Sequence, residues 1–298
     1  MALGAGGPEA HFVLGRALMG QGRMVEAEPE LREVIRANPT HLVAQSNLCE
    51  LLWMRSGSVA IASAEIDAAL RDHPGLSPLR ISKARLLMAA EDPDGAIREI
   101  ERGLAVTPDD PDLTLAATQT ALGHDAERAV RYSRRAMQLM PGNPQALSAY
   151  GDALLAAGDA PQAIAVATEL LRIQPDDGRG IALLASAGRI ANDPRSRELF
   201  DYKNFVRTQL IDVPPGWKTL DDYLRELAEA LHRLHPVSAH PVGQSLRGGS
   251  QLELDFENMG EPAIAAFAKA IHGPISRYME ALGHGSDPMR RRNTGRYR

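Results

Sequence analysis

The chain has 298 residues, a formal net charge of −5 and one cysteine, Cys49. A single cysteine excludes an intramolecular disulfide and fits a reducing compartment, and the acidic balance gives no sign of nucleic-acid binding. The start lacks the basic and apolar regions of a signal peptide, and no apolar run reaches the roughly 18 residues of a membrane span. With 4% aromatic residues, the composition favours helices packed through Ala and Leu. We therefore expect a cytoplasmic, mostly helical protein.

The first two-thirds of the chain repeats one plan at an interval of roughly 34 residues. In each repeat a small residue stands where two helices cross, a Gly or another turn residue ends the first helix, and a Pro ends the second. In the third repeat, Asp92 and Pro93 stand near the place of the turn Gly. The closing prolines are Pro39, Pro74, Pro108, Pro141 and Pro175. This pattern resembles the tetratricopeptide repeat over residues 8–177. The resemblance implies helix pairs that bury their apolar faces only by stacking on one another.

The register of the repeats predicts which residues pack at the helix crossings. In the first helix, Leu14, Gly15 and Leu18 are expected on one face, and Gly151 takes the crossing position in the fifth repeat. The fourth repeat is about a residue short, so we expect it to be the least regular. The second helices should each bury one alanine at the crossing: Ala27, Ala62, Ala96, Ala129 and Ala163.

Further helices are expected after the fifth pair. Residues 180–191 predict a single helix that caps the array, and the break at 192–194 predicts a boundary between a repeat domain, 1–192, and a second domain, 193–298. The next apolar stripe, from Leu199 through Phe205 and Val206 to Leu210, predicts a helix that ends before Pro214. Thr219, or Asp221 one turn later, is a fair N-cap for a helix that runs to Leu234.

Resemblance to the tetratricopeptide family also implies a concave face that binds a protein or peptide. The phase of the repeats places six polar side chains near that face. Solvated surface positions and a peptide groove are both open interpretations of these residues. Only Asn47 matches the clamp that some members form around a C-terminal carboxylate, so no clamp is assigned. The candidate groove residues are Arg16, Asn47, Arg55, Arg85, Thr118 and Asp152.

After Pro241 the apolar period changes from helical to alternating. Leu252 and Leu254 alternate with acidic residues, and two glycines separate two short extended runs, so residues 244–255 predict a β-hairpin. The fold class expected overall is therefore a tetratricopeptide superhelix followed by a smaller α+β segment. A helix over residues 262–282 should follow, with a break or kink near Gly273 caused by Pro274. Residues 293–298 have the pattern of a further strand.

The order of elements from about residue 200 resembles the entry to a family of 2-oxoglutarate- and iron(II)-dependent dioxygenases, whose members are often fused to tetratricopeptide repeats. The segment QSLRGGSQ carries the resemblance together with the helix IHGPISRYMEAL. The family-like positions are Gln244, Ser245, Arg247, Gly248, Gly249 and Gln251.

That resemblance implies iron(II) and 2-oxoglutarate as cofactors of the full-length family, with iron held by two His and one carboxylate. None of the nine histidines is followed two places later by Asp or Glu. The sequence therefore assigns no catalytic, cofactor-binding or metal residue, and we expect the chain as given to be inactive. Either the chain is truncated before the iron motif or the resemblance misleads.

Two other clusters were weighed. His232, His235 and His240 are interpreted as histidines near a helix end rather than as a metal site. The arginines of residues 290–298 are interpreted as a solvated tail or an unpaired strand rather than as a nucleic-acid site. The sequence thus leaves two functional hypotheses: a peptide-binding module joined to the leading part of a dioxygenase, or a non-enzymatic repeat scaffold with a small C-terminal cap.

Overall fold

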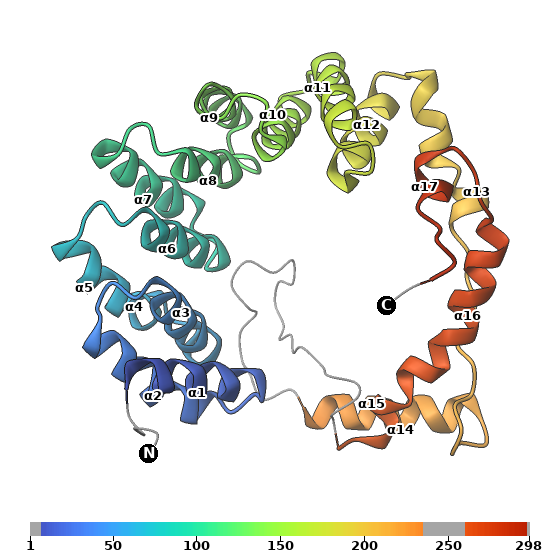
Figure 1. Cartoon of the computed structure of the whole chain (residues 1–298), viewed down its shortest axis with the longest axis horizontal. Helices are drawn as coiled ribbons and strands as arrows, with labels where there is room; N and C mark the ends of the chain where they lie inside the picture. Colours follow the sequence, from blue (N-terminus) through green and yellow to red (C-terminus); the bar gives the residue numbers. More distant parts are fainter. Residues whose placement is uncertain (1–6, 235–259, 297–298) are drawn as a thin grey trace, which may run out of the picture. The chain divides into compact units, whose positions relative to one another are not determined.

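A computed structural model describes residues 7–234 and 260–296 of the chain. The described residues divide into two compact units, one over 7–141 and one over 142–234 with 260–296. Both units are built from helices, and no strand occurs in the described ranges (Figure 1). This confirms the mostly helical repeat fold.

The first unit contains four consecutive helix pairs. Each pair packs a first helix against a second helix that follows it after a short turn, and the first helices of neighbouring pairs also pack on one another. The helices are α1 (Pro8–Gly20), α2 (Met24–Ala37), α3 (Leu42–Ser56), α4 (Val59–Ala62), α5 (Ala64–Asp72), α6 (Ser77–Ala89), α7 (Pro93–Val106), α8 (Pro111–Ala121) and α9 (Ala126–Leu139).

Prolines set the ends of the second helices as the sequence predicts. The helices α2, α5, α7 and α9 of the first unit, and α11 of the second, all end two residues before one of the five closing prolines. A proline disfavours the helical conformation in the residue before it, so the helix stops at that point. The local steric effect of each proline therefore sets where its repeat ends.

The turns are closed by side-chain caps. Asp92 accepts a hydrogen bond from the Gly95 N–H at 2.7 Å and begins α7, which confirms its expected role at the turn. Asp110 caps α8 in the same way at 2.9 Å. Such a cap satisfies one of the N–H groups that the first helical turn leaves unpaired.

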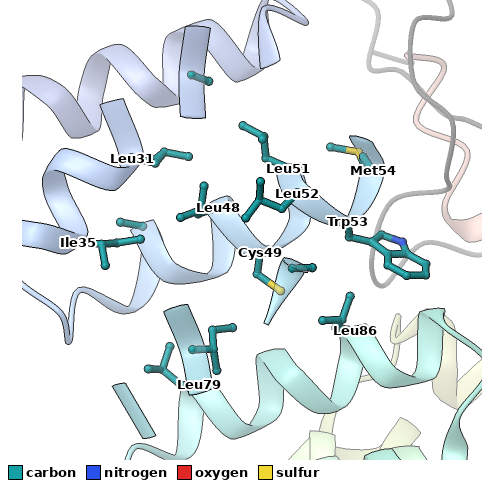
Figure 2. Packing of buried hydrophobic residues seen from close by; sticks show 14 of the residues in the cluster. Leu31, Ile35, Leu48, Cys49, Leu51, Leu52, Trp53, Met54, Leu79 and Leu86 are labelled. Atoms are coloured by element: carbon teal, nitrogen blue, oxygen red, sulfur yellow. The ribbon is translucent and has the colours of Figure 1, made fainter. Parts of the chain in front are cut away.

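The crossing alanines lie where the register predicts. All five are buried, with exposed fractions between 0 and 3%. Ala27 and Ala62 lie in one cluster with leucines and isoleucines of the first three pairs, and Figure 2 shows Leu31, Leu48, Leu79 and Leu86 in this core. Small side chains at the crossings allow the helices to approach closely. The predicted role of these alanines is confirmed.

Two expectations about the first unit are wrong: one concerns the regularity of the fourth pair, the other the burial of Leu14. The fourth pair has unbroken helices, whereas the second helix of the second pair is divided at Ser63 into α4 and α5. The Ser63 hydroxyl bonds to Asp67 Oδ2 at 2.7 Å, a local contact that competes with the helical pattern. Leu14, expected on one face with Gly15 and Leu18, is 47% exposed, whereas Gly15 and Leu18 are buried.

The second unit contains the fifth pair, the helix that follows it and the C-terminal helices. Its elements are α10 (Pro144–Ala156), α11 (Ala160–Ile173), α12 (Gly178–Ile190), the 3₁₀ helix η1 (Pro194–Phe200), α13 (Tyr202–Phe205), α14 (Leu220–Arg233), α15 (Pro262–Ala265), α16 (Phe267–Leu282) and α17 (Pro288–Arg291).

Glycine at the fifth crossing is required by the packing of α12. A Cβ on Gly151 would lie 2.1 Å from Leu183 Cδ2, so the Leu183 side chain would have to move to admit it. The helix α12 packs against α10 and α11, as expected for the element that caps the pairs. Gly151 is therefore the small crossing residue that the sequence predicts.

The helix expected from Leu199 to Leu210 is not formed, and this prediction is wrong. It is replaced by η1, the single turn α13 and a non-helical segment over 206–213. Val206 and Leu210 are 63% and 79% exposed, so their helical spacing buries nothing. Contacts with α16 hold the segment instead: the Asp212 N–H donates to the Ala270 carbonyl at 2.8 Å, and the Tyr278 hydroxyl donates to the Phe205 carbonyl at 2.8 Å.

The break expected near Gly273 is not formed, while the alternative of a kink there stays a prediction. Helix α16 runs through Pro274, and the interruption lies earlier, at Ala266 between α15 and α16. Before it, Ala263 accepts a hydrogen bond from Tyr223, a fully buried residue of α14, at 3.1 Å. Thr219 caps α14 as predicted, with the Asp222 N–H 3.1 Å from its hydroxyl.

The described C-terminal residues contain no strand, and two of them are bonded to other elements. Arg291 donates to Asp176 Oδ1 at 2.7 Å and to the Pro175 carbonyl at 2.9 Å. Asn293 donates to the carbonyls of Met279 and Gly283 and so closes the end of α16. These contacts turn the chain and anchor it, which an extended strand would not allow.

Two predictions stay open. The hairpin over residues 244–255, with the dioxygenase-like positions Gln244, Ser245, Arg247, Gly248, Gly249 and Gln251, lies outside the described residues. The domain boundary predicted at residue 192 also remains a prediction.

Candidate functional site

The six predicted groove residues differ in how they meet the surface. Arg16 and Arg85 are exposed and Asn47 is half-buried, so these three are available to a ligand. The Arg16 guanidinium lies 5.9 Å from the centre of the Phe12 ring on its own helix, while Arg85 has no ion pair with a described residue.

The remaining three have other partners. Arg55 forms an ion pair with Glu28 of α2, and so bridges two helices. Thr118 is 1% exposed and its hydroxyl donates to the Thr114 carbonyl one turn earlier, so it does not reach the surface. Asp152 belongs to the second unit, where burial raises the pKa of its carboxyl and the nearby positive charge of Arg179 opposes that rise.

A small cavity of about 100 Å³ lies between the first helices of the second and third pairs. It is lined by residues of α3 and α6, including the predicted residue Arg85. Across it the hydroxyls of Ser46 and Ser82 are 2.8 Å apart and hydrogen-bonded. Glu50 supplies a carboxylate on the α3 side. The cavity is therefore polar, with hydroxyls and both signs of charge within one helix-to-helix groove.

Sequence reasoning found Arg85 but missed the serine pair and Glu50. The signal was weak, because Ser46 and Ser82 lie 36 residues apart, close to one repeat interval but not at equivalent positions of the two first helices. Neighbouring first helices pack side by side, so residues one period apart meet. Serine is too common on helical surfaces for that spacing alone to mark a site.

Cys49 lines the same cavity but is not a nucleophile. Burial raises the pKa of its thiol to about 12, and the negative charges of Glu50 and Asp67 act in the same direction. The thiolate is the reactive form of cysteine, and it is suppressed at neutral pH. The cavity is therefore equipped for binding rather than for covalent chemistry.

A buried ion pair joins the two helices of the third pair. Arg80 of α6, 8% exposed, contacts Glu99 of α7, 2% exposed, with 2.5 Å between Nη1 and Oε1. The Arg80 guanidinium also donates to the Pro74 carbonyl at 2.9 and 3.0 Å. Lys83 lies 3.3 Å from Glu99 and 2.5 Å from Asp67 of α5. This network fixes the α6 side of the small cavity to the neighbouring second helices.

A larger cavity of about 390 Å³ lies among α2, α5 and the start of α3. Its lining is mixed, with Ile35, Ala68 and Ala69 beside the charged residues Arg32 and Glu65. It shares no lining residue with the small cavity, so the two are separate hollows.

The described residues contain no group of three His, Cys, Asp or Glu side chains arranged to hold a metal ion. His232 contacts the Ala228 carbonyl through Nδ1 at 2.7 Å, while His235 and His240 lie outside the described residues. In those same ranges, no helix combines the length and the apolar character that a bilayer crossing requires.

Comparison with known proteins identifies the repeats. Models of the tetratricopeptide repeat match residues 2–41 and 123–187, so the helix pairs within these two ranges are tetratricopeptide repeats. No curated protein matches the chain significantly. The comparisons give no support for a dioxygenase-like C-terminal part.

Solved structures of repeat proteins share the fold. A tetratricopeptide repeat protein from Parabacteroides merdae aligns with a TM-score of 0.52 at 14% identity, over 92% of this chain and 98% of its own. PilW, a type IV pilus biogenesis factor, aligns with a TM-score of 0.52 at 14% identity, over 68% and 95%. PilF of Pseudomonas aeruginosa aligns with a TM-score of 0.50 at 14% identity, over 74% and 97%. At this identity the likeness concerns the fold alone.

Proposed function

We propose that this chain of tetratricopeptide repeats is a protein-interaction scaffold that binds an extended peptide segment across α3 and α6. The observation that carries the proposal is the polar cavity between these helices, with Asn47 and Arg85 on the accessible surface beside it. A helix-to-helix groove with a few convergent polar groups is the usual form of a recognition site.

The chemistry of the groove favours a peptide with an acidic side chain. Arg85 is exposed and has no ion pair with a described residue, so its planar guanidinium is available to a carboxylate. The Ser46 and Ser82 hydroxyls and the Asn47 amide supply hydrogen bonds of the kind that hold a peptide backbone. The small volume of the cavity, about 100 Å³, suits one short side chain rather than a large ring.

A scaffold is favoured over the enzyme fragment. The family models match repeats only, and the thiol in the cavity is protonated at neutral pH. No specific observation supports iron(II) or 2-oxoglutarate, and the expected inactivity of the chain stays a prediction.

The test is a selection of displayed peptides on the full chain, followed by affinity measurements on variants. Peptides that bind the proposed groove should be enriched in Asp and Glu and should bind Arg85→Glu at least tenfold more weakly. A matched control is Arg98→Glu, which reverses an exposed arginine on the second helix α7 and should leave the affinity unchanged. Binders that tolerate Arg85→Glu, or that lose equal affinity with Arg98→Glu, would place the binding face elsewhere.

A further inference from the structure

The second and third pairs place equivalent residues around one position at the start of their first helices. Gln45 and Arg80 are equivalent, because each side chain donates to the carbonyl of the closing proline six residues earlier, Pro39 or Pro74. The repeat spacing also makes Glu65 the counterpart of Glu99. The two pairs therefore share a proline carbonyl and a glutamate at equivalent places, but one has Gln45 where the other has Arg80.

In the third pair an arginine of the chain itself fills this position. The Arg80 guanidinium bonds to the Pro74 carbonyl and to Glu99. Gly103 makes room for it, since a Cβ there would lie 2.8 Å from Arg80 Cδ. The Glu99 carboxylate, the Pro74 carbonyl and the space left by the missing side chain of Gly103 thus form a complete guanidinium site.

In the second pair the shorter Gln45 leaves that position as the cavity of about 390 Å³. Its Nε2 reaches the Pro39 carbonyl at 2.8 Å, which fixes the orientation of the amide. Its Oε1 has no hydrogen-bond partner although the residue is 1% exposed. An unpaired buried acceptor is costly, so this oxygen calls for a hydrogen-bond donor.

The charges around the cavity also favour a donor that is positive. Its two arginines already have carboxylate partners: Arg32 bonds to Glu65 at 2.7 Å, and Arg36 to Glu33 at 2.5 Å. Asp72, also in the lining, has no ion pair with a described residue. The groups left to a ligand are acceptors. The side chains of Arg32 and Glu65 are 39% and 38% exposed, so the cavity is open to solvent.

We infer that the cavity among α2, α3 and α5 is a docking site for an arginine side chain of a partner protein, whose guanidinium takes the place that Arg80 takes in the next repeat. Asp72 and Glu65 line the cavity and offer carboxylates to its charge, and the unpaired Oε1 of Gln45 is the acceptor proposed for one N–H. The planar group matches carboxylate geometry in a way that an ammonium does not. This site is separate from the groove between α3 and α6.

The test is a nuclear magnetic resonance titration of the full chain, with the Gln45 side-chain amide and the methyl groups of Ala68 and Ala69 as reporters. The probes are the N-acetyl amides of arginine, lysine and citrulline, since citrulline has the shape of arginine without its charge. Arginine should give saturable shifts of all three reporters, lysine weaker ones and citrulline none. The absence of saturable shifts with arginine, or equal shifts with citrulline or lysine, would overturn the inference.

Two variants sharpen the result. Asp72→Asn alters an exposed side chain and should weaken arginine binding about two- to fivefold, the effect of one partly solvated charge pair. The double variant Gln45→Arg, Ala69→Gly copies the third repeat into the second and should abolish the shifts of Ala68. The inference would be contradicted if Asp72→Asn bound arginine as tightly as the parent. It would also be contradicted if the folded double variant still showed shifts of the Ala68 methyl group. Arg85→Glu, which affects only the other groove, should leave the titration unchanged.

Discussion

The second and third repeats share a backbone plan but join their helices with different polar groups. In the third, Arg80 and Glu99 form a buried ion pair beneath the helix crossing. In the second, Gln45 stands where the arginine would be, Glu65 pairs with Arg32 of the preceding repeat, and a cavity remains. The comparison shows that the repeat framework depends on proline, alanine and leucine, while the polar positions are free to become either a structural joint or a binding site.

The largest predicted effect concerns the reactivity of the Cys49 thiol, which should be much lower in the native protein than in the unfolded chain. Its equivalent in the third repeat is Ala84, and its pKa is raised to about 12 by burial and then by Glu50 and Asp67. At pH 8 the native protein should react with a thiol reagent on the order of a thousandfold more slowly than the unfolded chain, whose thiol has a pKa near 8.5. Labelling with and without denaturant measures the ratio, and similar rates in both would contradict the burial.

The same thiol predicts a pH dependence of stability. The pKa of Cys49 is higher in the folded state, so the unfolded chain loses the thiol proton first as pH rises. This contribution to stability is complete below about pH 8.5 and is lost as pH rises towards 12. Cys49→Ala, which copies the third repeat, should lack that part of the alkaline decline in denaturant melts. Identical declines in parent and variant would refute the assignment.

Removal of the buried arginine should destabilise the third repeat strongly. Arg80→Ala leaves the Glu99 carboxylate buried without its main partner, and such a break costs about 3 kcal/mol or more. The control is Arg32→Ala, which removes an arginine from the partly exposed pair with Glu65 and should cost less than about 1 kcal/mol. Urea unfolding of both variants measures the difference, and equal losses would show that the two joints are energetically alike.

Overpacking of the shared crossing should affect both repeats similarly. Ala62→Phe and Ala96→Phe each insert a ring at a position that is 0–3% exposed, with an expected cost of about 1–3 kcal/mol. Ala60→Phe is the matched control, because Ala60 lies in the same short helix as Ala62 but is exposed. Thermal melts of the three proteins provide the test. Loss of stability in Ala60→Phe equal to that in Ala62→Phe would contradict the register.

The helix caps should show the smallest difference between the two repeats. Asp92 accepts the Gly95 N–H at 2.7 Å, whereas Ser58 accepts the Ile61 N–H at 3.4 Å. We expect Asp92→Ala to cost about 1 kcal/mol and Ser58→Ala about half as much. Denaturant midpoints at constant slope resolve this difference. A larger loss for Ser58→Ala would mean that the shorter distance does not reflect the stronger cap.

Local rules that leave a clear mark in the sequence were predictable. The closing prolines, Asp92 at its turn and Thr219 before α14 each act on neighbouring residues, so their effects can be read without knowledge of the rest of the chain. The groove was only partly predictable. Arg85 and Asn47 follow from the phase of the first helices, but the phase cannot show that Thr118 is covered by its neighbours.

The sequence by itself determined the period of the repeats, the ends of their helices and the alanines at their crossings, because these depend on backbone sterics and on side-chain size at fixed spacing. Tertiary structure alone decided that Gln45 borders a cavity while Arg80 fills one, since the result depends on which partner each side chain meets across the helices. It also decided that residues 206–213 are not helical, because hydrogen bonds to Ala270 and from Tyr278 outweigh a helical apolar spacing that has nothing to pack against.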